Sequence, residues 1–380
     1  MPSRLESGDP GRDAVVFVSM ARGIGGPARS LLTVLANLDP DLDRVLFAPH
    51  GDLAHRALAA GTVREHVPMP YALRRRQWSR VKAAVLLARY VRSNRQRVLV
   101  VHANGQSELN ISALAMLVAR VPVVMWAHAS RANPSAGLLR WLWRRAGDRV
   151  EWLAVSPTAR STLADTLALD PATISVVENP IDPDDVVAGR RSSGSVTVSY
   201  LGLAAPHKGF DLLPEIIRAV DRQDVGFDLF VAPPDPRLPL ELRPPWEALH
   251  ELSSTYDVLF RGRVFDVRAA YQETDIVLCP SREESFGRIA AEAMMNGIPV
   301  VASDIPAYRE LIGGSGAGLL FPLDDPGAAA AAIRRLADDE SLRHQVGERG
   351  RQHTTRYLPG QVVQDLEAVY RRAGARSDGG

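Results

Sequence analysis

Short apolar runs rich in β-branched residues recur along the chain, separated by longer segments in which apolar residues lie three or four positions apart. Runs of this length, bounded by turn residues, predict buried parallel strands, and the longer segments predict helices that cover them. The predicted strands are 14–20, 45–48, 98–102, 121–126, 152–155, 174–177, 196–201, 227–232, 258–260, 276–279, 299–302 and 318–321. Strand and helix alternate throughout, so the expected fold class is α/β with doubly wound sheets.

A polar stretch rich in Gly, Ser and Arg interrupts this alternation at 184–195. Such a composition is typical of a linker. A chain of 380 residues is long enough for two domains. We therefore predict one Rossmann-like domain over 1–187 and a second over 188–358.

Residues 275–304 contain the clearest unit, a strand, a polar loop, a helix that opens at Ser285 and runs to about Asn296, and a second strand. Free backbone N–H groups at the start of that helix, around 286–289, would lie at the carboxyl edge of a parallel sheet, where an anion or a sugar hydroxyl binds. Glu284 and Glu292 are placed to hold hydroxyls at the two ends of a nucleotide sugar. The alternative is an acid favoured by the helix dipole together with an ordinary surface glutamate.

The letters ESFG at 284–287, EAM at 292–294 and GIPVVAS at 297–303 resemble the E-x7-E signature of the retaining GT-B glycosyltransferases of family 4. The resemblance implies two Rossmann-like domains facing a cleft, with a final helix at 359–380 crossing back to the first domain. It implies transfer of a hexose from a nucleoside diphosphate sugar, a UDP- or GDP-sugar, to a glycan, lipid or small-metabolite acceptor. The sugar nucleotide is the donor substrate, and no cofactor is implied.

The same resemblance assigns roles to individual residues. Glu284 and the amides of Phe286 and Gly287 would hold the donor sugar, and Glu292 the ribose. Lys208, in a Pro-His-Lys-Gly loop, would bind the diphosphate, and His128, after a predicted strand, would lie near the 6-hydroxyl of the sugar. The predicted catalytic set is Glu284, Lys208 and His128. The predicted donor-binding set is Gly25, Gly26, Gly202, Arg263, Val264, Ser285, Phe286, Gly287, Arg288, Ile289 and Glu292.

One position departs from the family pattern. Leu203 stands where the family usually has an arginine, which removes one of two expected cations. Arg288, Arg263, Arg22 or Arg29 could substitute for it. This departure keeps open an alternative, a non-catalytic GT-B-like partner protein that binds a nucleotide or a glycan.

Two further features, His102 and the glycine-rich turn at 22–28, are each compatible with more than one function. His102 also follows a predicted strand and is a weaker candidate than His128. The glycine-rich turn at 22–28 loosely matches the G-x-G-x-x-A pattern of NAD-binding proteins, which makes an oxidoreductase an alternative. That pattern requires an acid at the end of the second strand, and this strand ends in Pro49-His50-Gly51. The resemblance instead suggests that Gly25 and Gly26 let the backbone approach donor phosphate or acceptor.

Composition excludes several classes of protein. The 45 basic and 44 acidic residues give no general attraction to nucleic acid. One cysteine, Cys279, implies neither a disulfide framework nor a thiolate metal site. No Asp-x-Asp motif stands at a strand end, so no metal is expected. No apolar run is long enough to span a membrane, and 1–13 lacks the apolar core of a signal peptide, so a cytoplasmic protein is expected.

Residues 71–97 hold nine basic side chains and no acid. Trp78, Val81, Val85 and Ala88 recur there at helical spacing, and a basic amphipathic helix can lie on an anionic membrane surface. Membrane-associated members of the family use such a helix in the first domain, which suggests peripheral contact with the inner membrane face. The alternative is a core-packing helix with an arginine-rich solvent face.

Overall fold

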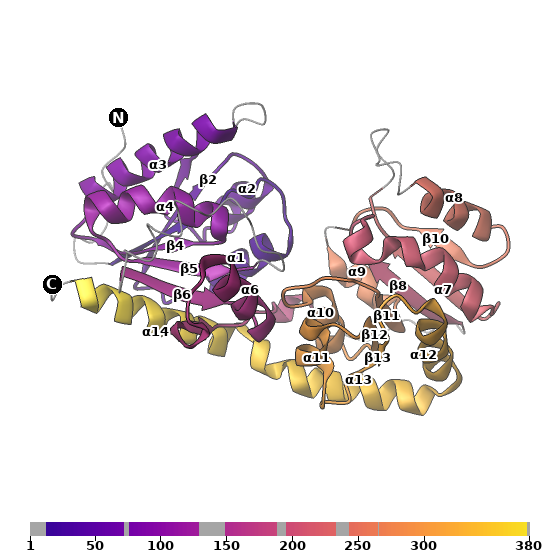
Figure 1. Cartoon of the computed structure of the whole chain (residues 1–380). Coiled ribbons are helices and arrows are strands. Elements are labelled where there is room, and N and C mark those ends of the chain that lie inside the picture. The colour runs from indigo at the N-terminus through magenta and orange to yellow at the C-terminus, as the bar shows by residue number, and fades with distance from the viewer. Residues whose placement is uncertain are drawn as a thin grey trace. The chain divides into compact units, whose positions relative to one another are not determined.

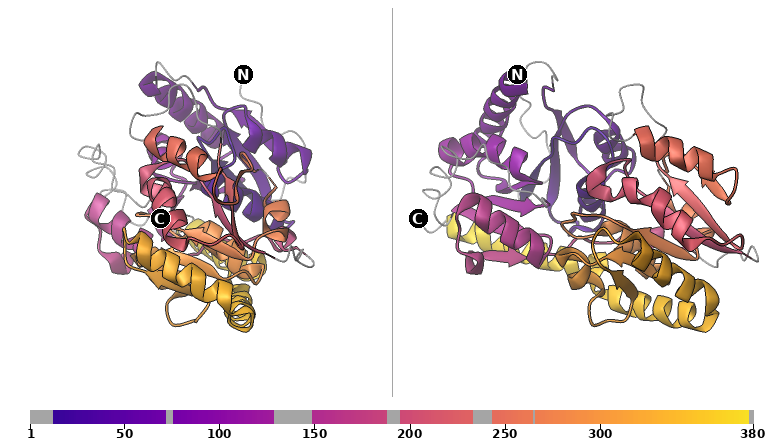
Figure 2. Two further views of the ribbon diagram at one scale, coloured as in Figure 1. Left: turned by 90° about the vertical axis from the view of Figure 1, so that its right-hand side faces the viewer. Right: turned by 45° about the vertical axis from the view of Figure 1, so that its right-hand side comes forward.

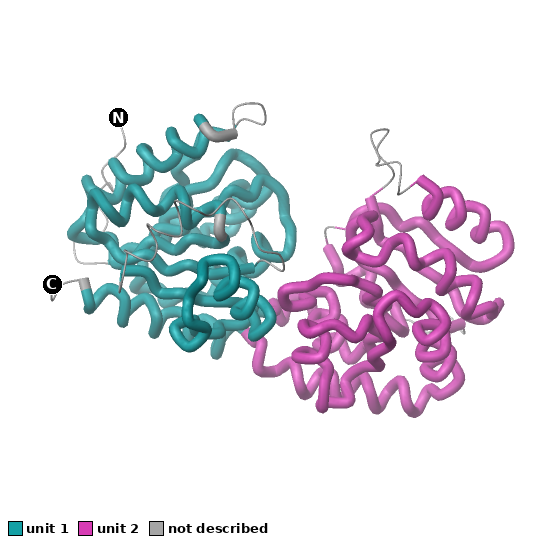
Figure 3. The backbone as a smooth tube through the Cα atoms, viewed as in Figure 1, with its two compact units in different colours: residues 1–180, 359–380 teal, residues 181–358 magenta. Residues whose placement is uncertain are grey.

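The computed structural model describes residues 13–71, 76–128, 149–187, 195–232, 243–264 and 266–377. The chain divides into two compact units, one formed by 1–180 with 359–380 and the other by 181–358 (Figures 1 and 3). Each unit has its own parallel sheet and its own covering helices. The predicted α/β class with two Rossmann-like domains is confirmed.

The sheet of the first unit contains seven parallel strands within the described residues, in the order β3-β2-β1-β4-β5-β6-β7. Their bounds are β1 Ala14–Val18, β2 Asp43–Ala48, β3 Glu65–Pro68, β4 Val98–Ala103, β5 Val123–Ala127, β6 Val150–Ala154 and β7 Ile174–Val176. The order reverses between β1 and β4. Strand β3 was not predicted, because its sequence, EHVP, has no apolar run and it pairs only at the edge of the sheet.

Helices cover the first sheet (Figures 1 and 2). Their bounds are α1 Gly26–Asn37, α2 Asp52–Ala59, α3 Arg76–Ser93, α4 Gln106–Ala119, α6 Pro157–Leu167 and α14 Pro359–Ser377. Helix α3 packs along α4, and α1 contacts α2 and α14. The C-terminal helix α14 also packs on β4, β5 and β6, so the end of the chain completes the core of the first unit.

The sheet of the second unit contains six described parallel strands in the order β10-β9-β8-β11-β12-β13. They are β8 Val196–Leu201, β9 Val225–Phe230, β10 Val258–Phe260, β11 Ile276–Cys279, β12 Val300–Ser303 and β13 Gly318–Phe321. The helices are α7 Leu213–Val220, α8 Arg243–Leu252, α9 Val267–Gln272, α10 Arg288–Met295, α11 Pro306–Ile312, α12 Pro326–Asp338 and α13 Glu340–Thr354. The order reverses between β8 and β11.

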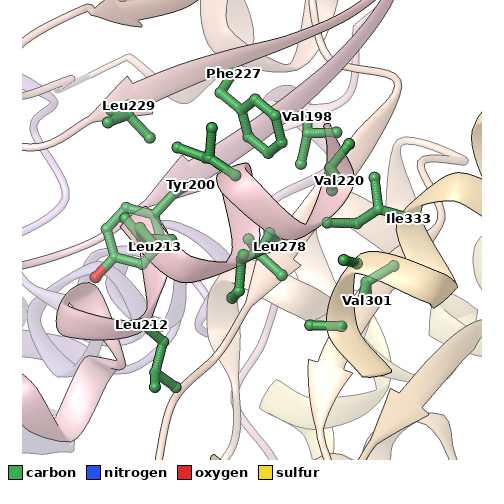
Figure 4. Packing of buried hydrophobic residues seen from close by; sticks show 14 of the residues in the cluster. Val198, Tyr200, Leu212, Leu213, Val220, Phe227, Leu229, Leu278, Val301 and Ile333 are labelled. Atoms are coloured by element: carbon green, nitrogen blue, oxygen red, sulfur yellow. The ribbon is translucent and has the colours of Figure 1, made fainter. Parts of the chain in front are cut away.

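The core of the second unit shows why these segments fold as they do (Figure 4). Val198 and Tyr200 lie two positions apart on β8, so they face the same side of the sheet, where Leu213 of α7 and Ile333 of α12 also pack. Burying one such side chain contributes about 1.5–3 kcal/mol. Because this burial favours apolar residues along the buried strands, apolar runs mark them in the sequence. Every predicted strand lies within two residues of its observed bounds.

Candidate active site

In each sheet the strand order reverses once, between β1 and β4 and between β8 and β11. At such a switch point the loops leave the sheet in opposite directions, and ligands of doubly wound proteins bind there, beyond the carboxyl ends of the strands. The loops after β8 and β11 carry Lys208 and Glu284. The loops after β1, β4 and β5 carry Gly25, Asn104 and His128.

Lys208 and Glu284 are in direct contact. The Lys208 ammonium lies 2.6 Å from Glu284 Oε1, and both side chains are largely buried. Ser281 and Tyr308 donate hydrogen bonds to the same oxygen, at 3.2 and 3.4 Å. Burial raises the pKa of Tyr308 well above its usual value, so its hydroxyl stays protonated and can donate. The carboxylate of Glu284 is therefore oriented by two hydroxyl donors and lies against the Lys208 ammonium.

Gly209 allows the two loops to approach each other, and Gly287 allows the loop after β11 to pack against α11. Gly209 has φ +68°, and a Cβ there would lie 2.0 Å from the carbonyl oxygen of Pro280. Gly287 has φ +84°, and a Cβ there would lie 2.7 Å from a ring carbon of Tyr308. A side chain at Gly209 would force the two loops apart, and one at Gly287 would push its loop away from Tyr308, so both positions require glycine.

The conformation of Gly287 corrects one prediction. The sequence placed the start of the helix at Ser285, whereas α10 begins at Arg288 with Gly287 as its N-cap. The left-handed φ of Gly287 keeps it out of the helix. The amides of Phe286 and Gly287 consequently belong to the loop.

Arg282 braces the two loops and was missed by sequence reasoning. Its guanidinium donates to both carboxylate oxygens of Asp211 at 2.7 and 2.8 Å, to Asp324 at 2.7 Å and to the carbonyl oxygen of Pro206 at 2.5 Å. The bidentate pair with Asp211 is a geometry that only arginine offers. Arg282 thereby joins the segment that carries Lys208 to the segment that carries Glu284.

Glu292 is fully buried on α10. Arg288 Nε lies 2.6 Å from its Oε1, and the hydroxyl of Tyr271 donates to its Oε2 at 3.1 Å. This excludes the interpretation of Glu292 as an ordinary surface glutamate. Arg288, one candidate to replace the missing arginine, lies against Glu292 in this structure. Ser285 and Ile289, two other predicted donor-binding residues, are partly buried.

Leu203, at the position of the missing arginine, is 59% exposed. The preceding Gly202 follows β8, where a Cβ would lie 3.0 Å from the hydroxyl of Tyr200. That hydroxyl donates to the carbonyl oxygen of Leu203 at 2.7 Å. The backbone of this loop is thus held by Tyr200 while the Leu203 side chain points away from the core.

The turn after β10 contains Gly262, at φ +74°, with Arg263 exposed and Val264 partly buried. The neighbouring Arg261 lies 3.1 Å from the buried carboxylate of Asp228. Arg261 therefore anchors the turn to the sheet. Arg263 and Val264 lie at the carboxyl edge with the other predicted donor-binding residues of this unit.

In the first unit, the loops at the switch point are linked by a short chain of hydrogen bonds. His128 Nε2 lies 3.0 Å from Asn104 Oδ1, and the Asn104 amide donates to the carbonyl oxygen of Pro27 at 3.3 Å. Gly25 is the N-cap of α1, which has no side-chain cap, and Gly25 and Gly26 are exposed. The structure thus brings His128 to the glycine-rich turn, through an asparagine that the sequence analysis did not select.

The surroundings of the glycine-rich turn at 22–28 bear on the alternative of an NAD-binding oxidoreductase and on Arg22 and Arg29, two of the four arginines that could replace the missing one. Strand β2 ends at Ala48 and Asp52 begins α2, so no acid stands at the strand end. Arg22 donates to the carbonyl oxygen of His50 at 3.3 Å and its guanidinium lies 5.4 Å from the ring centre of Tyr71. Arg29 is partly buried on α1.

Glu108, at the start of α4, is a buried acid that sequence reasoning missed. Its carboxylate accepts a hydrogen bond of 2.8 Å from the backbone N–H of Met20, just after β1. Burial raises the pKa of Glu108, against the opposing effect of that hydrogen bond and of nearby Arg80. Glu108 thus ties the loop after β1 to α4.

His102 is a core residue, which corrects its candidacy for the site. It lies within β4, fully buried, with its Nδ1 2.8 Å from the hydroxyl of Tyr370 on α14 and its ring against Phe17 and Trp126. Burial lowers its pKa to about 3, so it is neutral at physiological pH. It anchors the C-terminal helix to the sheet.

The chain is similar to known proteins over both of its units. The model for "Glycosyl transferases group 1" matches residues 195–339, and the model for "Glycosyltransferase Family 4" matches residues 24–185. Phosphatidyl-myo-inositol mannosyltransferase of Mycobacterium leprae is 30% identical over 288 residues, which cover 71% of this chain and 72% of that protein. D-inositol 3-phosphate glycosyltransferase of Corynebacterium diphtheriae is 32% identical over 126 residues, which cover 32% of this chain and 30% of that protein.

Solved structures share the fold at low identity. A glycosyltransferase from Rickettsia africae has a TM-score of 0.81 at 17% identity, covering 96% of this chain and 99% of that one. Anabaena Alr3699/HepE, solved in complex with UDP-glucose, has a TM-score of 0.77 at 17% identity, covering 94% and 98%. The chain belongs to the group 1 glycosyltransferases of family 4 and has their GT-B fold.

Proposed function

We propose that this protein transfers a hexose from a nucleoside diphosphate sugar, a UDP- or GDP-sugar, to a hydroxyl of a glycan, lipid or small-metabolite acceptor. The transfer retains the anomeric configuration and uses neither a metal ion nor a cofactor. The observation that carries this proposal is the contact between Lys208 and Glu284 at the β8/β11 switch point, with Glu292 buried on the helix that follows. The mannosyltransferase name of the Mycobacterium leprae relative and the UDP-glucose complex of the Anabaena protein support it.

The residues of the second unit suit the two ends of the donor. The Lys208 ammonium would neutralise the diphosphate as it leaves, when its negative charge is greatest. Glu284, oriented by Ser281 and Tyr308, would accept hydrogen bonds from sugar hydroxyls, which the amides of Phe286 and Gly287 would also contact. Glu292 would accept those of the ribose.

Retention requires no protein base on the far side of the sugar. In a retaining transfer the leaving phosphate can accept the acceptor's proton on the face from which it departs. His128 then positions the donor sugar, and its hydrogen bond to Asn104 fixes the imidazole. An inverting enzyme would instead need a general base placed opposite the leaving group.

A thermal-shift panel of UDP-, GDP-, ADP- and TDP-sugars would identify the donor, and NMR of the new glycosidic linkage would test the mechanism. An α-linked product from an α-linked donor is expected. His128→Ala should keep measurable activity with weakened donor use. A β-linked product, or complete loss of activity in His128→Ala, would contradict the retaining mechanism.

The exposed face of α3 carries a second part of the proposal, contact with an anionic membrane surface. Three large apolar side chains on it are exposed, Trp78 at 69%, Val81 at 54% and Val85 at 43%. Together with exposed cations they form one outer stripe: Trp78, Val81, Lys82, Val85, Arg89 and Arg92. The opposite face packs inward through Ala83, Leu87 and Val91, as does Ala88, which the sequence analysis had grouped with the apolar set.

This stripe differs from the solvent face of an ordinary helix, because it combines exposed apolar groups with cations and no acid. Apolar side chains insert at the headgroup boundary while arginines attract anionic lipids. No described helix is both long and apolar enough to cross a membrane, so the contact proposed is peripheral.

Sedimentation with phosphatidylglycerol vesicles tests the contact. Binding should fade between 0.1 M and 1 M salt, where the Debye length falls from about 10 Å to about 3 Å. Trp78→Ser with Val85→Ser should weaken it, whereas Leu58→Ser, which changes an exposed leucine of α2, should not. Absence of binding at low salt would leave the stripe as a solvated face.

A further inference from the structure

A cavity of about 730 Å³ lies in the first unit where α3 ends and β4 begins. Among the residues that the structure describes, four arginines line it, Arg92, Arg95, Arg97 and Arg120, with one carboxylate, Asp13. Backbone and polar side chains between Ser93 and Gln96 complete much of its wall. We call this cavity the arginine pocket.

The arginine pocket is separate from the candidate active site. Helix α3 runs antiparallel to β4, so its C-terminal end, with Arg92, lies at the amino edge of the sheet. His128 and the glycine-rich turn lie at the carboxyl edge. The six residues of β4 that lie between the two edges span about 20 Å. A ligand in the pocket therefore cannot touch the groups that the proposed reaction uses in this unit.

The charges of the pocket are not balanced from within. Arg97 donates to Asp43 at 2.7 Å, but Asp43 already accepts from Arg64 at 2.6 Å, so two cations share one carboxylate. Arg92, Arg95 and Arg120 are exposed, and no ion pair to them is seen within the described part of the chain. Asp13 is the one carboxylate among the described residues of the wall, so the mutual repulsion of these arginines favours an anion between them.

We propose that the arginine pocket binds a phosphate-bearing ligand, supplied either as the headgroup of an anionic lipid or as a free polyphosphate. Guanidinium groups bind phosphate oxygens in bidentate fashion, and a phosphate concentrates more charge in a small volume than a carboxylate does. Arg92 belongs both to the pocket and to the outer stripe of α3. A stripe lying on a membrane would thus bring the pocket to the level of the headgroups, while a free polyphosphate needs no membrane.

Titration calorimetry with tripolyphosphate tests the proposal on the full chain. All titrations use the Lys208→Ala variant as the background, because it lacks the cation of the proposed diphosphate site. Each surface cation contributes roughly 5-fold to the binding of an anionic partner, so R95Q/R120Q should weaken binding about 25-fold. The matched control R56Q/R218Q removes two exposed arginines elsewhere and should leave binding unchanged. Asp13→Asn, which removes the opposing carboxylate, should tighten it roughly 5-fold.

A second arm uses phosphatidylglycerol vesicles with the same two pairs of variants. Loss of vesicle binding in R95Q/R120Q beyond that of R56Q/R218Q identifies a lipid headgroup as the source. Loss of tripolyphosphate binding alone identifies a free polyphosphate. If the two pairs behave alike in both arms, the pocket binds no phosphate ligand and the proposal is overturned. Failure of glycosyl transfer would leave these outcomes unaffected.

Discussion

The most informative single change is Lys208→Ala. The ammonium lies 2.6 Å from Glu284 Oε1 and its side chain is 26% exposed, so its charge is partly screened. Two unit charges 4 Å apart at an effective dielectric constant of 20 interact by about 4 kcal/mol. A loss of about 100-fold in kcat corresponds to about 2.7 kcal/mol, the scale measured for one lost charge-stabilising donor. We expect a loss of at least that size.

The assay is release of nucleoside diphosphate from a sugar nucleotide without acceptor, in solution. The chain offers a matched control, because Lys82 is its one other lysine. Lys82→Ala should hydrolyse the donor at the normal rate. Thermal denaturation of both variants would verify that each is folded.

A double variant separates two explanations for the loss. Removing Lys208 leaves the Glu284 carboxylate without its cation, and that charge would itself repel a diphosphate. If Lys208 only neutralises Glu284, K208A/E284Q should recover turnover. If Lys208 binds the diphosphate, the double variant should stay at least as slow as K208A. Recovery in the double variant, or normal turnover in K208A, would refute the assignment.

Two further predictions concern buried or partly buried carboxylates. Glu292→Ala should weaken binding of the free nucleoside diphosphate, whereas Glu284→Ala should weaken only the sugar nucleotide; calorimetry that finds equal losses would show that the two acids do not divide the donor between them. The folded state raises the pKa of Glu108, so the folded chain binds the carboxyl proton more tightly than the unfolded chain does. The contribution of Glu108 to the free energy of unfolding therefore falls as pH rises through the interval between the unfolded and the folded pKa. Glu108→Gln should therefore be at least as stable as the parent at pH 7.5, and its Tm should decline less steeply above pH 4.5. An unchanged slope of Tm against pH would show that the buried Glu108 carboxyl does not cause this decline.

The local pattern of the sequence determined most of the secondary structure. Buried parallel strands such as Ile276–Cys279 were readable because both faces of such a strand are covered, which demands a continuous apolar run. Edge strand β3 was not readable, since an edge strand needs fewer apolar residues. The start of α10 was misplaced by three residues because a single backbone angle, the positive φ of Gly287, decided it.

The candidate site depended on residues that only the tertiary structure could bring together. Lys208 and Glu284 are 76 positions apart and meet because β8 and β11 are neighbours, and strand order is not contained in any local periodicity. Sequence motifs could name both residues through a family resemblance, but not the brace that Arg282 forms with Asp211 and Asp324.

Burial decided the remaining roles, and burial is a property of the packed whole. His102 and His128 both follow the same pattern in the sequence, a histidine at the end of an apolar run. The structure separates them, because the C-terminal helix covers His102 with Tyr370 while His128 extends past its strand to Asn104. The sequence determined which residue types stand at the strand ends. The packing of a helix more than 250 residues away decided which of them can reach a ligand.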